Sequence, residues 1–95
     1  MPDRDIMAAA VDKYGGARQL VKCCEELGEL TQAICKLFDG AQWSEDDIEA
    51  VVEEVADVEI MIAQVRMILA IDPDMEQRWH DRKLRRLWRQ LDDGT

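Results

Sequence analysis

Apolar residues recur at helical spacing through the two central segments of the chain, and this periodicity constrains the fold most strongly. Between positions 17 and 38 the apolar arc contains Leu20, Cys23, Cys24, Leu27, Leu30, Thr31, Ile34 and Phe38. Between positions 44 and 70 it contains Ile48, Val51, Val55, Val58, Met61, Ile62, Val65 and Leu69. Residues three or four apart share one face of an α-helix, whereas strands alternate at every second residue. No stretch shows convincing alternation, so the sequence predicts an all-α fold.

Turn and capping residues divide the chain into four predicted helices, which cover approximately residues 4–14, 17–38, 44–70 and 73–94. Glycines at positions 15 and 16 end the first, and Asp39-Gly40 is a turn signal after the second. Ser44 is suited to cap the third helix, with Asp47 three residues later. Asp72 and Pro73 form a cap followed by proline at the first helical position. The short connections imply antiparallel neighbours, hence a four-helix bundle.

The length of 95 residues allows one domain, residues 1–95. A domain of this size buries only about 60–65% of the surface that its unfolded chain exposes, so its core is thin. The third and fourth predicted helices also carry wide apolar faces with Met and Trp. We therefore expect a homodimer or homotetramer.

Charge is distributed unevenly along the chain, whose formal net charge is −9. Residues 44–59 contain eight acidic residues and no basic one, whereas residues 76–91 contain six basic residues against two acidic ones. The overall acidity disfavours binding to nucleic acid and to acidic membrane surfaces. The basic final segment is better matched to the acidic third helix, within one chain or between subunits.

Cysteine use and the absence of targeting signals suggest a cytoplasmic protein. The three cysteines include no C-x-x-C pair, which argues against a disulfide framework and a zinc site. The N-terminal residues do not resemble a signal peptide. The most apolar stretch, residues 60–71, is too short to span a membrane.

Four carboxylates form the most informative pattern for function. On a helical wheel Glu54 lies about 40° from Val58, the centre of its apolar arc, where an unpaired carboxylate is costly. Asp57 is its i+3 neighbour, and Glu26 and Glu29 repeat this spacing beside the apolar arc of the second helix. Few basic residues are nearby. Two such pairs on adjacent helices suit Mg²⁺, although acidic runs are also common on solvated helix faces.

The acidic pattern also resembles a known family. Glu25-Glu26-Leu27-Gly28-Glu29 and Glu54-Val55-Ala56-Asp57 resemble the EExxE…ExxD signature of MazG-like nucleotide pyrophosphohydrolases, in the all-α NTP pyrophosphatase superfamily. The similarity covers nearly the whole chain. It includes residues before the first motif and the basic final helix, at Tyr14-Gly15, Gln19, Lys22 and Asp81-Arg82-Lys83-Leu84.

The resemblance implies hydrolysis of a nucleoside triphosphate to the monophosphate and pyrophosphate, as house-cleaning of nucleotides, by a dimer or tetramer. By motif, Glu26, Glu29, Glu54 and Asp57 would be ligands of Mg²⁺, for which Mn²⁺ would substitute. The neighbouring Glu25 and Glu53 would accept a proton from the attacking water or hold a further ion.

Three further residues are candidates for substrate binding. Lys22 and Lys83 are candidates for contacts with phosphates, and Trp43 is a candidate for stacking on a base. Solvated surface roles for the lysines and a packing role for Trp43 remain open. Two other functions also remain open: a catalytically silent helical oligomer acting as an interaction module, and a metal-stabilised bundle without turnover.

Overall fold

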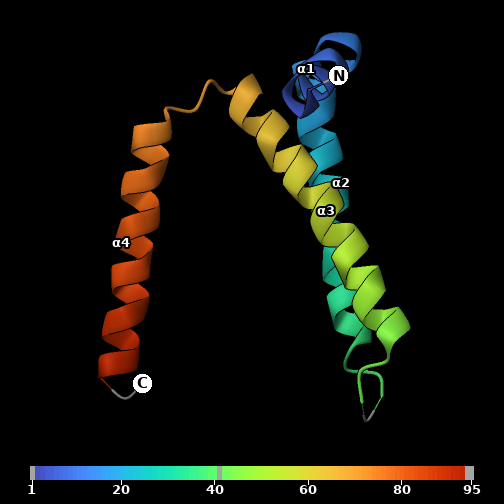
Figure 1. Cartoon of the computed structure of the whole chain (residues 1–95), viewed down its shortest axis with the longest axis vertical. Helices are drawn as coiled ribbons and strands as arrows, with labels where there is room; N and C mark the ends of the chain where they lie inside the picture. The colour runs from blue at the N-terminus through green and yellow to red at the C-terminus, as the bar shows by residue number, and fades with distance from the viewer. Residues whose placement is uncertain (1, 41, 94–95) are drawn as a thin grey trace.

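A computed structural model describes residues 2–40 and 42–93, and every regular element in those residues is an α-helix. The helices are α1 (Asp3–Tyr14), α2 (Gly16–Lys36), α3 (Glu45–Ile68) and α4 (Pro73–Asp92), shown in order in Figure 1. The predicted all-α fold is confirmed, and the helix boundaries lie within about two residues of those expected. Gly94, at the predicted end of the last helix, lies outside the described residues.

The predicted caps fix the starts of α3 and α4. The Ser44 hydroxyl accepts a hydrogen bond from the backbone N–H of Asp47 at 3.1 Å. Asp72 accepts one from the N–H of Asp74 at 2.9 Å, and Pro73 is the first residue of α4. Each cap satisfies a donor that the first helical turn leaves without a partner. Both helices therefore begin where the sequence predicts.

Helices α2 and α3 form the structural core as an antiparallel hairpin (Figure 1). Cys23 and Ala33 of α2 and Val58 and Met61 of α3 are its buried apolar residues. Toward the end of the hairpin near α1, the buried Gln19 and Gln64 side chains join the two helices through a 2.8 Å hydrogen bond. Helix α1 packs against this same end of the hairpin.

Helix α4 stands apart from the other three helices (Figure 1). It has no buried residue. Among the described residues, neither α1, α2 nor α3 packs against it. Its first turn is tied to α3 by Glu76, whose carboxylate accepts hydrogen bonds from the Arg66 guanidinium at 2.8–3.1 Å. Ala70, in the connection, has a φ of 49°, a left-handed conformation uncommon for a residue with a side chain. This elbow directs α4 away from the hairpin.

The four predicted helices are thus present, but only three pack together within one chain. The predicted apolar arcs are also covered only in part. Cys24, Leu27, Ile34 and Phe38 of the α2 arc are exposed, as are Ile48, Val55 and Leu69 of the α3 arc. Since helix α4 leaves the hairpin, it does not cover these residues. No helix among the described residues is long and apolar enough to cross a lipid bilayer.

Candidate metal centre

The antiparallel hairpin brings together the four carboxylates that the sequence singled out. Glu26 and Glu29 lie about one turn apart on α2, and Glu54 and Asp57 have the same spacing on α3. One oxygen from each side chain lies within 4.8 Å of the selected oxygens of the other three. Spacing along the sequence paired the acids on each helix, and helix packing joins the two pairs.

Two of these carboxylates carry buried oxygen atoms without a partner. Glu26 is only 7% exposed, and Glu54 is half-buried. In each of them Oε2 is buried and accepts no hydrogen bond. Removing such an oxygen from water without a partner costs about 1–3 kcal/mol, and more when it is charged. A bound cation would offset this cost.

One basic side chain does approach the cluster. The Lys22 ammonium lies 3.3 Å from Oε1 of Glu26 and 3.8 Å from Oε2 of Glu25. Its hydrogen bond to Glu26 and the charge of that carboxylate raise the pKa of Lys22. This contact agrees with the expectation of few basic neighbours, since the i+4 spacing puts Lys22 beside Glu26. Among the described residues, this single ammonium group still faces several carboxylates.

The pKa of Glu29 reflects the crowding of carboxylates in the cluster. A hydrogen bond with Glu26 and the negative charge of that side chain raise the pKa of Glu29, with smaller contributions from desolvation and Glu54. The raised pKa of Glu29 thus reflects how closely the carboxyls of Glu26 and Glu29 approach each other.

The donor set fits Mg²⁺ or Mn²⁺. Hard divalent cations prefer carboxylate oxygens, and Mg²⁺ sits about 2.1 Å from each ligand, so opposite ligands are about 4.2 Å apart. The observed limit of 4.8 Å exceeds this by an amount that side-chain rotation can remove. Both pairs are carried by helices, which fix the backbone positions from which the four side chains extend.

The other predicted site residues lie at different distances from this centre. Glu25 and Glu53 are exposed neighbours of the ligand candidates, and Glu25 is paired with Lys22. Trp43 is 61% exposed and precedes α3, whose first residue, Glu45, lies about two and a half turns before Glu54. Lys83 lies on the detached α4, 5.9 Å from the centre of the Trp79 ring. Within one chain, Lys83 is therefore not brought to the acidic cluster.

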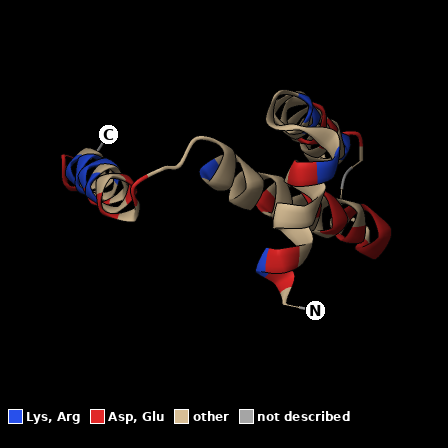
Figure 2. Ribbon diagram, turned by 90° about the horizontal axis from the view of Figure 1, so that it is seen from above, with Lys and Arg blue, Asp and Glu red and all other residues tan. Residues whose placement is uncertain are grey.

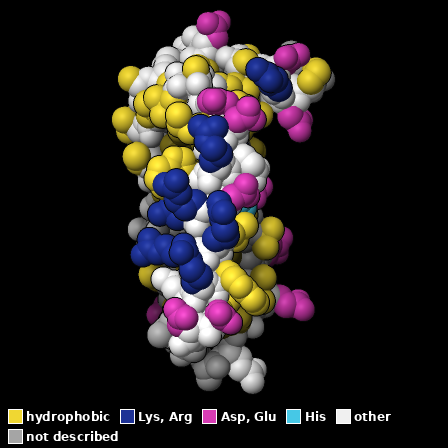
Figure 3. Space-filling view, turned by 90° about the vertical axis from the view of Figure 1, so that its left-hand side faces the viewer, with side chains coloured by type: hydrophobic (Ala, Val, Ile, Leu, Met, Phe, Trp, Pro, Cys, Tyr) yellow, Lys and Arg dark blue, Asp and Glu magenta, His cyan; other side chains and the backbone are white. Residues whose placement is uncertain are grey.

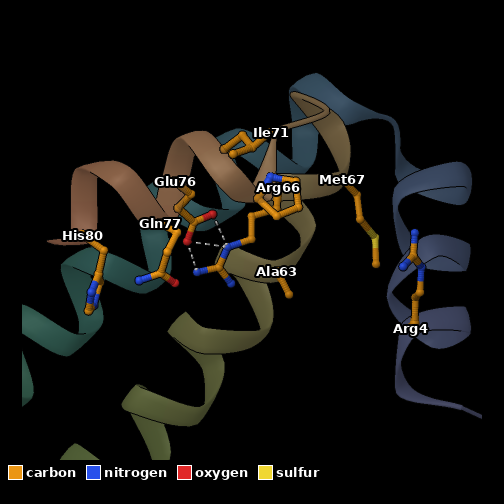
Figure 4. Close-up of a pocket in the computed structure, with 9 residues that line it drawn as sticks. Arg4, Ala63, Arg66, Met67, Ile71, Glu76, Gln77 and His80 are labelled. Carbon is orange, nitrogen blue, oxygen red and sulfur yellow. Dashed lines mark hydrogen bonds and ion pairs between the residues drawn. The ribbon is translucent and has the colours of Figure 1, made fainter.

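A hollow of about 590 Å³ lies beside the α3–α4 connection and is lined by residues of α1, the end of α3 and the first turns of α4 (Figure 4). Arg4, Arg66, Glu76, Gln77 and His80 are among the residues that line it. The charge of Arg66 is already balanced by Glu76, which Figure 4 shows in the wall of the hollow. Sequence reasoning missed this ion pair, because its members are ten residues apart and on different helices. The acidic centre lies elsewhere, along the α2–α3 hairpin.

Charge is segregated between the helices in space as it is along the chain. Figure 2 shows acidic residues along α3 and basic residues on α4. The candidate centre therefore lies in the acidic part of the molecule, where a cation is attracted and a free polyphosphate is repelled.

Comparison of the chain with protein-family models, curated proteins and solved structures found no match in any of the three.

Proposed function

We propose that this protein hydrolyses a nucleoside triphosphate to the nucleoside monophosphate and pyrophosphate, in a reaction that depends on Mg²⁺ or Mn²⁺. The observation that carries the proposal is the cluster of Glu26, Glu29, Glu54 and Asp57, whose oxygens converge within 4.8 Å. The unpartnered buried oxygens of Glu26 and Glu54 distinguish this cluster from an ordinary solvated acidic face. They supply a reason for a cation to bind there.

The residues divide into three proposed roles. Glu26, Glu29, Glu54 and Asp57 hold the metal. When bound, the metal would neutralise the negative charge of the polyphosphate and lower the pKa of a water molecule. The exposed carboxylates next to the ligands, Glu25 and Glu53, would accept the proton of the attacking water.

Lys22 would bind the substrate. Its ammonium lies in the cluster on a half-exposed, flexible side chain, paired with Glu26. Because a bound cation would take over the charge of Glu26, the ammonium would be released to contact a phosphate oxygen. Trp43 is exposed and free of the core, which is compatible with stacking on a base.

The resemblance to MazG-like enzymes selects cleavage between the α- and β-phosphates. The sequence contains no G-x-x-x-x-G-K-[ST] loop, so it lacks the P-loop that commonly supports release of the γ-phosphate. A cytoplasmic role in removing non-standard or excess nucleotides is the biological setting that the resemblance suggests.

A product-resolved substrate screen tests this function. Standard, deaminated and oxidised nucleoside triphosphates are incubated with the full chain and Mg²⁺, and the nucleotide and phosphate products are separated. Monophosphate with pyrophosphate is the expected pair. Diphosphate with inorganic phosphate would contradict the proposed reaction.

Two other outcomes would point to the alternative functions. Mg²⁺-dependent stabilisation without hydrolysis of any triphosphate would indicate a metal-stabilised bundle. The absence of both metal binding and hydrolysis would favour an interaction module. The large exposed apolar surface provides the structural basis for that function.

A further inference from the structure

Another hollow, of about 540 Å³, lies at the end of the hairpin nearest α1 and adjoins the acidic centre. Tyr14 at the end of α1 and Arg18, Lys22 and Glu25 of α2 are among the residues that line it. Lys22 links the hollow to the centre, because its ammonium lies 3.3 Å from Oε1 of Glu26. A ligand anchored at the acidic centre therefore has room to extend into this hollow.

The hollow lies on a side of α2 that also carries part of the acidic centre. Arg18, Lys22, Glu25 and Glu29 are spaced by four, three and four residues and lie within about 60° of one another on the helical wheel. From the centre toward the start of the helix, Lys22 is the first cation, and Arg18 lies about 6 Å farther along the axis. Two cations therefore follow the acidic centre on one side of α2.

The guanidinium of Arg18 is available to bind an anion. Among the described residues it has no carboxylate within ion-pair distance, whereas Lys22 is already paired with Glu25 and Glu26. Arg18 is exposed and rests on the ring of Tyr14, whose centre lies 5.4 Å from the guanidinium carbon. Contact with an aromatic face orients a guanidinium without neutralising its charge. Arg18 therefore presents an unbalanced positive charge in the hollow.

The charges on α3 make the two ends of the hairpin different. Beside the end of α2, the first turns of α3 carry four acidic residues, Glu45, Asp46, Asp47 and Glu49. Because the helices are antiparallel, the start of α2 lies beside residues 60–65 of α3, as the hydrogen bond between Gln19 and Gln64 shows. No residue of that range is charged. A polyphosphate that extends from the centre thus meets carboxylates in one direction and Arg18 in the other.

The basic residues of α4 do not supply this positive charge within one chain. Figure 3 shows Lys and Arg side chains gathered along α4, and among the described residues no other helix packs against α4. The charge of Arg66 is balanced by Glu76. In the hollow that adjoins the acidic centre, the cations that line the wall are Lys22 and Arg18.

We propose that Lys22 and Arg18 bind the β- and γ-phosphates of the nucleoside triphosphate, with the γ-phosphate at Arg18. This inference rests on the proposed function and adds the orientation of the substrate at the same site. The two phosphates that leave as pyrophosphate extend from the metal toward the start of α2, and the nucleoside extends the other way, toward Trp43 before α3. The planar fork of an arginine side chain matches two oxygens of a terminal phosphate. Since a diphosphate has no γ-phosphate, Arg18 also selects triphosphates over diphosphates.

Steady-state kinetics of Arg18→Gln, with the best triphosphate of the screen and the diphosphate of the same nucleoside, test this assignment. For the triphosphate, kcat/KM should fall by about 10-fold or more, mainly through a higher KM, because a charge-assisted hydrogen bond is lost. For the diphosphate, kcat/KM should be unchanged, so the preference for the triphosphate falls by the same factor. Arg18→Lys keeps the charge without the fork and should restore part of the preference.

Lys36→Gln is the matched control. Lys36 is exposed on the same side of α2 as Arg18 but lies beyond the acidic centre in the opposite direction. The control loses the same charge and should behave as the wild type with both substrates. A loss for the triphosphate in Lys36→Gln but not in Arg18→Gln would show that the phosphates extend the other way. That result would overturn the proposal, as would equal losses for triphosphate and diphosphate in Arg18→Gln.

Binding of inorganic pyrophosphate separates this proposal from the proposed reaction, because it needs no turnover. In titration calorimetry with Mg²⁺, Arg18→Gln should bind pyrophosphate about 10-fold more weakly than the wild type and Lys36→Gln do. That pattern in a protein that hydrolyses no triphosphate would support the phosphate site and contradict only the reaction. Hydrolysis by the wild type, together with undiminished pyrophosphate binding by Arg18→Gln, would leave the reaction standing and overturn the role of Arg18.

Discussion

Replacing Glu54 by glutamine should change the stability of the protein in opposite directions without and with Mg²⁺. The selected Glu26 and Glu54 oxygens are at most 4.8 Å apart. At that separation two unit charges repel by about 1 kcal/mol in water and about 3.5 kcal/mol at an effective dielectric constant of 20. Glutamine has the same shape without the charge, and its amide can donate to a neighbouring carboxylate. The metal-free variant should therefore be more stable than the wild type.

The midpoint of thermal unfolding reports this difference. A gain of 1 kcal/mol corresponds to a rise of roughly 4–8 °C for a domain of this size. In excess Mg²⁺ the order should reverse: a ligand at 100 times its dissociation constant stabilises the wild type by about 2.7 kcal/mol, whereas the variant lacks one ligand. Melting curves in EDTA and in Mg²⁺ measure both effects.

A matched control separates the cluster from general charge effects. Glu59→Gln makes the same change of charge at an exposed position of α3 outside the cluster. It should leave the response to Mg²⁺ unchanged. The reasoning fails if metal-free Glu54→Gln is less stable than the wild type, or if Mg²⁺ stabilises the two proteins equally.

Three further predictions concern the hairpin and its acids. Gln64→Leu leaves the buried amide of Gln19 without its acceptor and should destabilise the protein by about 1–3 kcal/mol in urea unfolding; adding Gln19→Leu should restore part of the loss. Because Glu26 raises the pKa of Glu29, the Glu29 carboxyl binds its proton more tightly in the folded state than in the unfolded chain. The resulting stabilisation is present at low pH and is lost as pH rises through the raised pKa. Glu29→Gln should flatten this part of the stability–pH curve measured in EDTA. Ser44→Ala removes the cap of α3 and should cost about 1 kcal/mol by the same urea assay, whereas an unchanged midpoint would show that the cap is dispensable.

The helices were predictable because their signals are local. The period of the apolar residues identified α2 and α3, and the caps at Ser44 and Asp72 fixed the starts of α3 and α4. The proximity of the four acids was also predictable, because an i, i+3 pair on each of two antiparallel helices faces a common seam.

The position of α4 was not predictable, because it depends on the elbow. No sequence rule places Ala70 in a left-handed conformation or pairs Arg66 with Glu76 across the connection. The short connection suggested an antiparallel bundle, but the apolar face of α4 is compatible equally with its own hairpin and with another chain. The pairing of Lys22 with Glu26 has a local signal in the i+4 spacing.

The most direct test of the proposed metal-dependent chemistry is turnover by Asp57→Asn, compared with the wild type and with Asp46→Asn, at an exposed α3 position outside the cluster. Monophosphate and pyrophosphate are quantified with Mg²⁺ and, separately, with EDTA, using the best substrate of the screen. The wild type and Asp46→Asn should turn over only with Mg²⁺. Asp57→Asn should be folded and at least about 100-fold slower, as expected when a principal electrostatic contribution is removed. Full activity in a folded Asp57→Asn protein, or undiminished activity of the wild type in EDTA, would contradict the assignment of this cluster as the metal centre.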